Sequence, residues 1–166
     1  MKKLVRDLMK TDVTTVHPDI SLPDLQRLFL KAGFGAVPVL DRANHLLGIV
    51  SRSDVVRKFS LEQSLAELAD SDFDAILGVQ DDDDALDSIG AAVGRRLSKL
   101  HAEDIMISEV ETIGPDDPLS EAAARMVKRH IHRLPVLEQG RLVGIVSAFD
   151  FMALYASEAS DTAGRG

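Results

Sequence analysis

Apolar residues recur at helical spacing twice along the chain. The first set is Leu22, Leu25, Leu28, Phe29 and Ala32, and the second is Leu119, Ala122, Ala123, Met126 and Val127. A spacing of three or four residues places such side chains on one face of a helix. The pattern therefore predicts two amphipathic helices, and Ser21 with Asp24 provides a capping box for the first one.

Each predicted helix is followed by two short apolar runs with a polar turn between them. The first pair lies at 37–40 and 46–50, and the second at 134–137 and 142–146. β-branched residues are common in these runs, which predicts a hairpin in each case. Each hairpin ends in Gly-Ile-Val-Ser with an aspartate three residues after the serine. This frame is typical of a strand that turns into a capped helix, and its glycine permits a close approach of another backbone segment.

The two sets of elements are copies of one repeat. A shift of 97 residues superposes Asp7 on Asp104, Pro18 on Pro115, and Pro38-Val39-Leu40 on Pro135-Val136-Leu137. After the loss of one residue in a turn, Gly48-Ile49-Val50-Ser51 and Asp54 fall on Gly144-Ile145-Val146-Ser147 and Asp150. The sequence therefore predicts two β-α-β-β-α units, at 3–58 and 101–156.

Residues 59–100 have no counterpart in the repeat and are expected to form an acidic helical insert. Leu61, Leu65 and Leu68 suit a short helix, and a separate helical turn is expected to end at Gly78. The run Asp81-Asp82-Asp83-Asp84 suits the start of a helix, where anions are favoured, or a weak cation site or a docking face for a basic partner. The polar tail at 157–166 is expected to be disordered.

Composition narrows the classes of function. The 166 residues include no cysteine, which excludes disulfides, thiolate catalysis and cysteine-based metal sites. The net charge is −8, concentrated in the insert, and no long stripe of lysine and arginine appears, so nucleic-acid binding is not expected. No apolar run approaches the roughly 20 residues that span a bilayer, and we expect a cytoplasmic protein with no membrane association.

The motifs and their order resemble the CBS domain, named for cystathionine β-synthase. The likeness rests on Asp7-Leu8-Met9, Thr15-Val16-His17-Pro18, Val37-Pro38-Val39 and Gly48 to Asp54, and on their counterparts at 104–106, 112–115, 134–136 and 144–150. Two repeats in tandem resemble a Bateman module. The resemblance implies an α+β fold in which the repeats pack sheet to sheet as a pseudo-twofold module, and it implies a homodimer.

The resemblance also implies a ligand and its contacts. Adenosyl compounds such as AMP, ADP, ATP or S-adenosylmethionine would bind in clefts between the repeats, with no required cofactor and no catalysis. Asp54 and Asp150 would accept hydrogen bonds from both ribose hydroxyls, and Ser51 and Ser147 would meet phosphate, with Ser53 beside Asp54. The residues expected to flank the base are Thr15, Val16, Pro18, Ala36, Val37 and Pro38 in one site, and Thr112, Ile113, Pro115, Arg133, Leu134 and Pro135 in the other.

The two predicted sites differ in their basic residues. By resemblance, His132 and Arg133 are expected to reach phosphate in the Asp54 site, whereas the matching positions of the first repeat are Gly35 and Ala36. The sequence therefore predicts that a phosphorylated ligand prefers Asp54.

Other interpretations of the same residues stay open. Both Ser-x-x-Asp motifs are also compatible with plain capping boxes, His132 with a surface histidine, and Arg133 with a salt bridge. The leading hypothesis is a regulatory module that senses an adenine nucleotide and signals by conformational change. The alternative is a ligand-free structural or interaction module that assembles through its dimer face or binds a client protein through the 60–100 insert. No pair of nucleophile and base indicates an enzyme, and no metal site is predicted.

Overall fold

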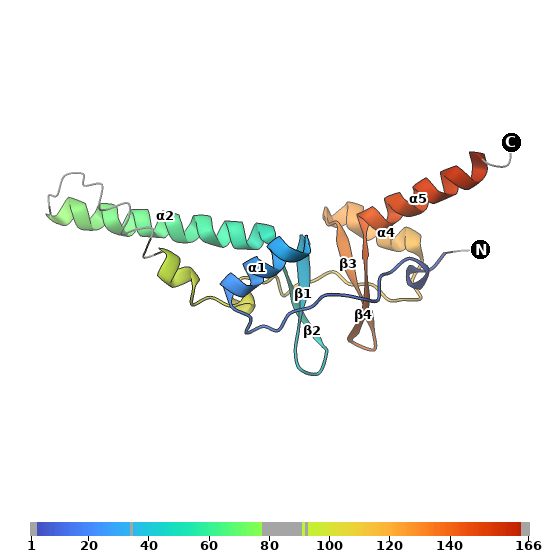
Figure 1. Ribbon diagram of the computed structural model, residues 1–166, viewed down its shortest axis with the longest axis horizontal. Helices are drawn as coiled ribbons and strands as arrows, with labels where there is room; N and C mark the ends of the chain where they lie inside the picture. Colours follow the sequence, from blue (N-terminus) through green and yellow to red (C-terminus); the bar gives the residue numbers. More distant parts are fainter. Residues whose placement is uncertain (1–2, 34, 78–90, 92, 164–166) are drawn as a thin grey trace. The chain divides into compact units, whose positions relative to one another are not determined.

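The computed structural model describes residues 3–33, 35–77, 91 and 93–163 (Figure 1). In chain order the elements are η1 (Val5–Asp7), α1 (Leu22–Ala32), β1 (Ala36–Leu40), β2 (Leu46–Ser51), α2 (Arg52–Leu77), η2 (Ala102–Asp104), α4 (Leu119–Arg129), β3 (Arg133–Glu138), β4 (Arg141–Ser147) and α5 (Ala148–Ala163). A helix, a hairpin and a second helix thus occur twice, which confirms the predicted α+β class and the repeat.

The two amphipathic helices occupy the predicted positions. α1 begins after Ser21, whose Oγ accepts a hydrogen bond from the Asp24 amide at 3.2 Å. It ends at Gly33, which has the left-handed backbone conformation that glycine adopts without strain. α4 ends in the same way at His130, which has a φ of 53°. The buried residues of these helices are Leu22, Leu25 and Phe29 in α1, and Leu119, Ala122 and Met126 in α4.

Each hairpin forms a two-stranded sheet, β1 with β2 and β3 with β4. The β3–β4 pair is antiparallel, and its register places Arg133 opposite Ser147. The first strand of each predicted β-α-β-β-α unit is reduced to a single parallel bridge, between Val16 and Val39 and between Ile113 and Val136. These bridges hold the segment that precedes each helix against its hairpin.

The compact units of the structure do not follow the repeats along the chain. One unit, here called the Asp150 unit, consists of residues 1–15, 41–46 and 109–166. The other, the Asp54 unit, consists of residues 16–40 and 47–108. The first segment of each repeat is therefore exchanged and folds with the hairpin of the other repeat.

Backbone hydrogen bonds fix the exchanged segments. In the Asp150 unit, Lys10 and Ile145 bond in both directions, with N–O distances of 2.8 and 2.9 Å. In the Asp54 unit, Ile107 and Ile49 do the same at 2.9 and 3.0 Å. Lys10 and Ile107 are equivalent positions of the repeat. The two exchanged segments therefore make the same backbone hydrogen bonds, but they carry different side chains at this position.

The glycine of each hairpin is required by this exchange. A Cβ added at Gly144 would lie 2.8 Å from the sulfur of Met9 and 3.0 Å from the carbonyl oxygen of Lys10. A Cβ at Gly48 would lie 2.8 Å from the sulfur of Met106 and 2.8 Å from the carbonyl oxygen of Ile107. The predicted close approach is confirmed, and the approaching backbone belongs to the other repeat.

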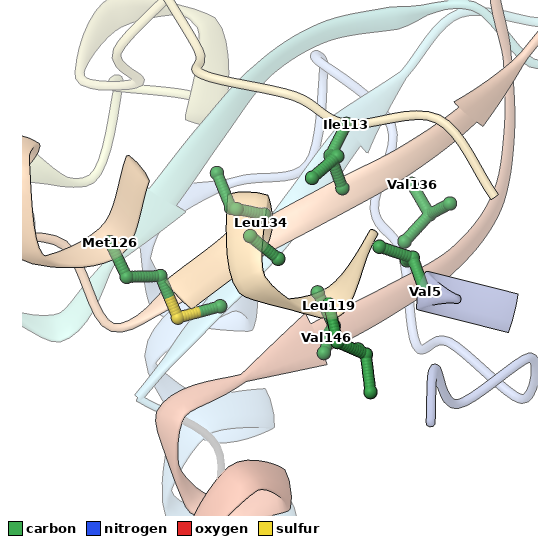
Figure 2. Close-up of a cluster of buried hydrophobic side chains, with 8 residues drawn as sticks. Val5, Ile113, Leu119, Met126, Leu134, Val136 and Val146 are labelled. Atoms are coloured by element: carbon green, nitrogen blue, oxygen red, sulfur yellow. The ribbon is translucent and has the colours of Figure 1, made fainter. Parts of the chain in front are cut away.

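Each unit has its own hydrophobic core, and each core includes a residue from the exchanged segment. Figure 2 shows the core of the Asp150 unit, with Val5 of η1 beside side chains from α4, β3 and β4. Its buried members are Val5, Ile113, Leu119, Ala122, Met126, Leu134, Val136 and Val146. The core of the Asp54 unit contains Val16, Leu22, Leu25, Phe29, Val37, Val39, Val50 and Ala102, the last from η2.

Two helices are longer than the apolar spacing indicated. α2 is one continuous helix from Arg52 to Leu77 instead of separate short helices, and its sequence contains neither glycine nor proline to interrupt it. α5 continues to Ala163, past residue 157, where a disordered tail was expected, and it also lacks both residue types. The predicted acidic run Asp81–Asp84 lies outside the described residues.

Candidate functional site

Ser51 and Asp54 form a reciprocal cap at the start of α2. Oδ2 of Asp54 accepts hydrogen bonds from the amide of Ser51 at 2.8 Å and from its hydroxyl at 2.5 Å. The amide of Asp54 donates to the Ser51 hydroxyl at 3.3 Å. The capping interpretation is therefore correct for this motif, and it uses one of the two carboxylate oxygens.

The second oxygen of Asp54 has a different environment. Asp54 is only 4% exposed, and its Oδ1 is a buried side-chain atom without a hydrogen bond among the described residues. The guanidinium of Arg57, one turn further along α2, lies 3.2 Å from Oδ1, but the Arg57 side chain is 70% exposed. A buried carboxylate oxygen that lacks a hydrogen bond is costly, because burial removes the water that would satisfy it. This oxygen is the least satisfied polar atom of the motif.

Ser147 and Asp150 repeat the cap at the start of α5. Oδ2 of Asp150 accepts from the Ser147 amide at 2.8 Å and from its hydroxyl at 2.5 Å. Asp150 is also buried, at 5% exposure, but its Oδ1 forms an ion pair with Lys10 Nζ at 3.0 Å. Both oxygens of this carboxylate are therefore engaged within the Asp150 unit.

Electrostatics at Asp150 follow from these contacts. Burial by itself raises the pKa of Asp150, but hydrogen bonds from Ser147 and Lys10 outweigh it, so the pKa lies below its ordinary value. Burial also lowers the pKa of the Arg133 guanidinium, and the negative charge of Asp150 opposes that change. Arg133 thus contributes a second positive charge near Asp150, on the strand directly opposite Ser147.

The predicted base-flanking residues are mostly core residues. Val37 and Pro38 in β1, and Leu134 and Pro135 in β3, are fully buried, so their side chains pack inside their units. The carbonyl oxygens of Pro38 and Pro135 accept hydrogen bonds from Val16 and Ile113. The partly exposed members of the predicted set are Thr15, Pro18, Ala36, Ser51, Thr112, Arg133 and Ser147, and Ser53 and His132 are exposed.

The structure brings some of these residues together and separates others. The Asp54 unit holds Val16, Pro18, Ala36, Val37, Pro38, Ser51, Ser53 and Asp54, and the Asp150 unit holds Thr112, Ile113, Pro115, Leu134, Pro135, Ser147 and Asp150. Thr15, His132 and Arg133 also belong to the Asp150 unit. A role of these three residues at Asp54 stays a prediction.

Two functional candidates were missed at the sequence level, Lys10 and Arg57. Both place a cation beside a buried motif aspartate. The signal was present in the repeat alignment, because Lys10 matches Ile107 and Arg57 matches Ala153 within otherwise similar segments. Mismatches of this kind within a repeated frame mark positions where the two copies differ.

Within the described part of the chain, no group of three or more histidine and acidic side chains is placed to hold a metal ion. None of the described helices combines the length and apolar character needed to cross a bilayer.

Comparison with known proteins identifies the family. The model of the CBS domain matches residues 5–61 and 102–157, together more than half of the chain. The chain therefore belongs to the CBS domain family and carries two CBS domains in tandem, which confirms the resemblance drawn from its motifs.

Relatives of similar length include the uncharacterized protein MJ1426 of Methanocaldococcus jannaschii. It is 32% identical over 158 residues, which cover 90% of this chain and 89% of that protein. The chain spans less than half of the length of several other curated relatives.

Solved CBS domain pairs share the fold. The pair of protein MJ0100, in complex with 5′-methylthioadenosine and S-adenosyl-L-methionine, has a TM-score of 0.65 and 23% identity, covering 95% of this chain and 99% of that one. CBSX2 in complex with AMP has a TM-score of 0.67 and 20% identity, covering 94% and 98%.

Proposed function

We propose that this tandem CBS pair is a regulatory module that binds an adenosyl ligand and signals by a change of conformation. Similar CBS pairs with bound AMP, 5′-methylthioadenosine and S-adenosylmethionine support this class of ligand. The observation that carries the proposal is the Asp54 carboxylate, which is buried and held by Ser51 through Oδ2, and whose Oδ1 accepts no hydrogen bond from the part of the chain that the structure describes.

Asp54 suits a ribose for a chemical reason. Two vicinal hydroxyls donate two hydrogen bonds, and an ionised carboxylate accepts them more strongly than a neutral group does. The cap fixes the carboxylate, so no side-chain entropy is lost when the ligand binds. The N-terminus of α2 adds the positive end of the helix dipole, which favours a phosphate nearby.

The test is a thermal-shift and calorimetric titration with AMP, ATP, S-adenosylmethionine and 5′-methylthioadenosine. A ligand that binds only the folded protein raises the melting temperature, by an amount that grows with its concentration. Asp54→Asn keeps the shape of the side chain but removes its charge, and should weaken binding about tenfold to a hundredfold, the value of hydrogen bonds to a charged group. Asp12→Asn, at an exposed aspartate outside both motifs, is the matched control.

Two results would contradict the proposal. One is the absence of any melting-temperature increase with all four compounds. The other is an equal loss of affinity in Asp54→Asn and Asp12→Asn, because the effect would then not depend on the motif.

A second candidate function is assembly, and it is favoured by exposed apolar side chains. In the Asp54 unit these include Leu30, Val56 and Phe59 on α1 and α2. In the Asp150 unit, Val127 on α4 and Phe149, Met152 and Tyr155 on α5 are exposed in the same way. Val56 and Phe59 on α2, and Phe149 and Met152 on α5, are three residues apart and so share a helix face, and exposed apolar faces are typical of protein interfaces. We propose a homodimer through these helices, and sedimentation of the wild type against Phe59→Asp would test it.

A further inference from the structure

We propose that Lys10 keeps the Asp150 motif closed to adenosyl ligands, so that each chain binds one ligand, at Asp54. This inference rests on the proposed function and decides which of the two motifs carries it.

The position of Lys10 is fixed by its backbone. Its amide and carbonyl both bond to Ile145, in the strand that leads directly to Ser147 and Asp150. From there its ammonium lies 3.0 Å from Oδ1 of Asp150, while Ser147 occupies Oδ2. The buried carboxylate is therefore satisfied from inside its own unit.

The equivalent position in the other unit cannot do the same. Ile107 makes the same two backbone hydrogen bonds, to Ile49, but its side chain has no charge and no donor. Among the described residues, Arg57 forms an ion pair with Asp54 from the same helix, and Oδ1 still accepts no hydrogen bond. The two motifs therefore differ in one contact: Lys10 satisfies Oδ1 of Asp150, whereas Oδ1 of Asp54 faces Arg57 at 3.2 Å without accepting a hydrogen bond from the described residues.

A ribose at Asp150 would have to break an existing interaction. Its hydroxyls need Oδ1, and taking that oxygen displaces the Lys10 ammonium from a buried, oppositely charged partner. Arg133 adds to the effect, because its positive charge also stabilises the carboxylate in the absence of ligand. At Asp54 the same ribose meets an oxygen that accepts no hydrogen bond from the described residues, although Arg57 lies 3.2 Å away, so the two motifs should differ in affinity.

Calorimetry with 5′-methylthioadenosine tests this inference, because that compound has the ribose diol but no phosphate that Lys10 could bind. Wild type should take one equivalent per chain. Lys10→Ile, which installs the residue found at position 107, should take a second equivalent of comparable affinity, and Lys10→Ile with Asp150→Asn should lose it. Ile107→Lys should weaken the single wild-type site at least tenfold.

Two control variants distinguish an effect of the Lys10 charge from an effect on folding. Lys10→Gln removes the charge but keeps a long polar side chain and should also open the second motif, which covers the case in which Lys10→Ile folds poorly. Lys31→Ile, the same substitution at an exposed position of α1, should leave one equivalent.

The inference is overturned if wild type binds two equivalents with equal affinity, or if neither Lys10 variant gains one. A titration with AMP tests whether Lys10 instead binds the phosphate of a ligand. Two equivalents in wild type and one in Lys10→Ile would make Lys10 a phosphate ligand. If no compound binds any of the proteins, the proposed function fails too. If wild type binds one equivalent that depends on Asp54, and Lys10→Ile adds none, only this inference fails.

Discussion

The close approach of the exchanged segment to Gly144 gives a quantitative prediction about stability. In Gly144→Ala the new Cβ would lie 2.8 Å from the sulfur of Met9 and 3.0 Å from the carbonyl oxygen of Lys10. The sulfur belongs to a flexible side chain, but the carbonyl is held by its hydrogen bond from Ile145. The Lys10 backbone must therefore shift, or its pairing with β4 must weaken.

The expected cost combines two opposing terms. Overpacking of a methyl group costs typically about 1–3 kcal/mol. Replacing glycine by alanine within a strand recovers about 0.5–1 kcal/mol of backbone entropy. The net loss should be about 1–2 kcal/mol, and in a chain of this size each kcal/mol lowers the melting temperature by roughly 2–4 °C. The melting temperature of Gly144→Ala should therefore fall by roughly 2–8 °C.

Thermal unfolding monitored by circular dichroism measures this difference. The matched control is Gly94→Ala, in the helical segment 93–97, where an added Cβ meets nothing within 4 Å. That control should be stabilised by about 0.5–1 kcal/mol, because alanine is a better helix former. In a Met9→Ala background, Gly144→Ala should cost less than in wild type, since one of the two close contacts is removed. An unchanged or raised melting temperature for Gly144→Ala would refute the reasoning.

Three further predictions concern stability. Ser21→Ala removes the hydroxyl that caps α1 and should cost about 1 kcal/mol in urea unfolding, and a loss below about 0.3 kcal/mol would speak against the cap. Leu134→Ala should cost about 2–5 kcal/mol, because Leu134 is fully buried, whereas Leu30→Ala, at 77% exposure, should change stability by no more than about 0.5 kcal/mol. The folded-state pKa of Asp150 lies below its ordinary 3.8, so its ionised form stabilises the fold above that pH, and this contribution is lost as the pH falls below 3.8. The unfolding free energies of wild type and Asp150→Asn should therefore converge in acid, and a constant difference between them would contradict the assignment.

Much of the fold could be predicted because its signals are local. Helix periodicity and caps act over about four residues, and a hairpin joins runs that are adjacent in sequence. α1, α4 and both hairpins followed directly from these patterns. The extent of α2 was also encoded, in the absence of glycine and proline from Arg52 to Leu77, but the changing apolar spacing suggested separate helices.

The candidate site was predictable only in part. The repeated Ser-x-x-Asp frame identified Asp54 and Asp150, and both are buried at the start of a helix. The sequence alone does not show that Val37 and Leu134 direct their side chains into the cores, because burial depends on what the rest of the chain covers.

The sequence by itself thus determined the secondary-structure elements, because these depend on neighbouring residues. It also determined the two repeats and their family, because these depend on the order and spacing of the motifs. Only the tertiary structure decided which segment pairs with which hairpin. The exchange brings Lys10 to Asp150 and Ile107 to Ile49, although each pair is far apart in sequence and no periodicity relates its members. The difference between the two motifs is therefore a property of the folded chain, because the side chains that create it arrive from the other repeat.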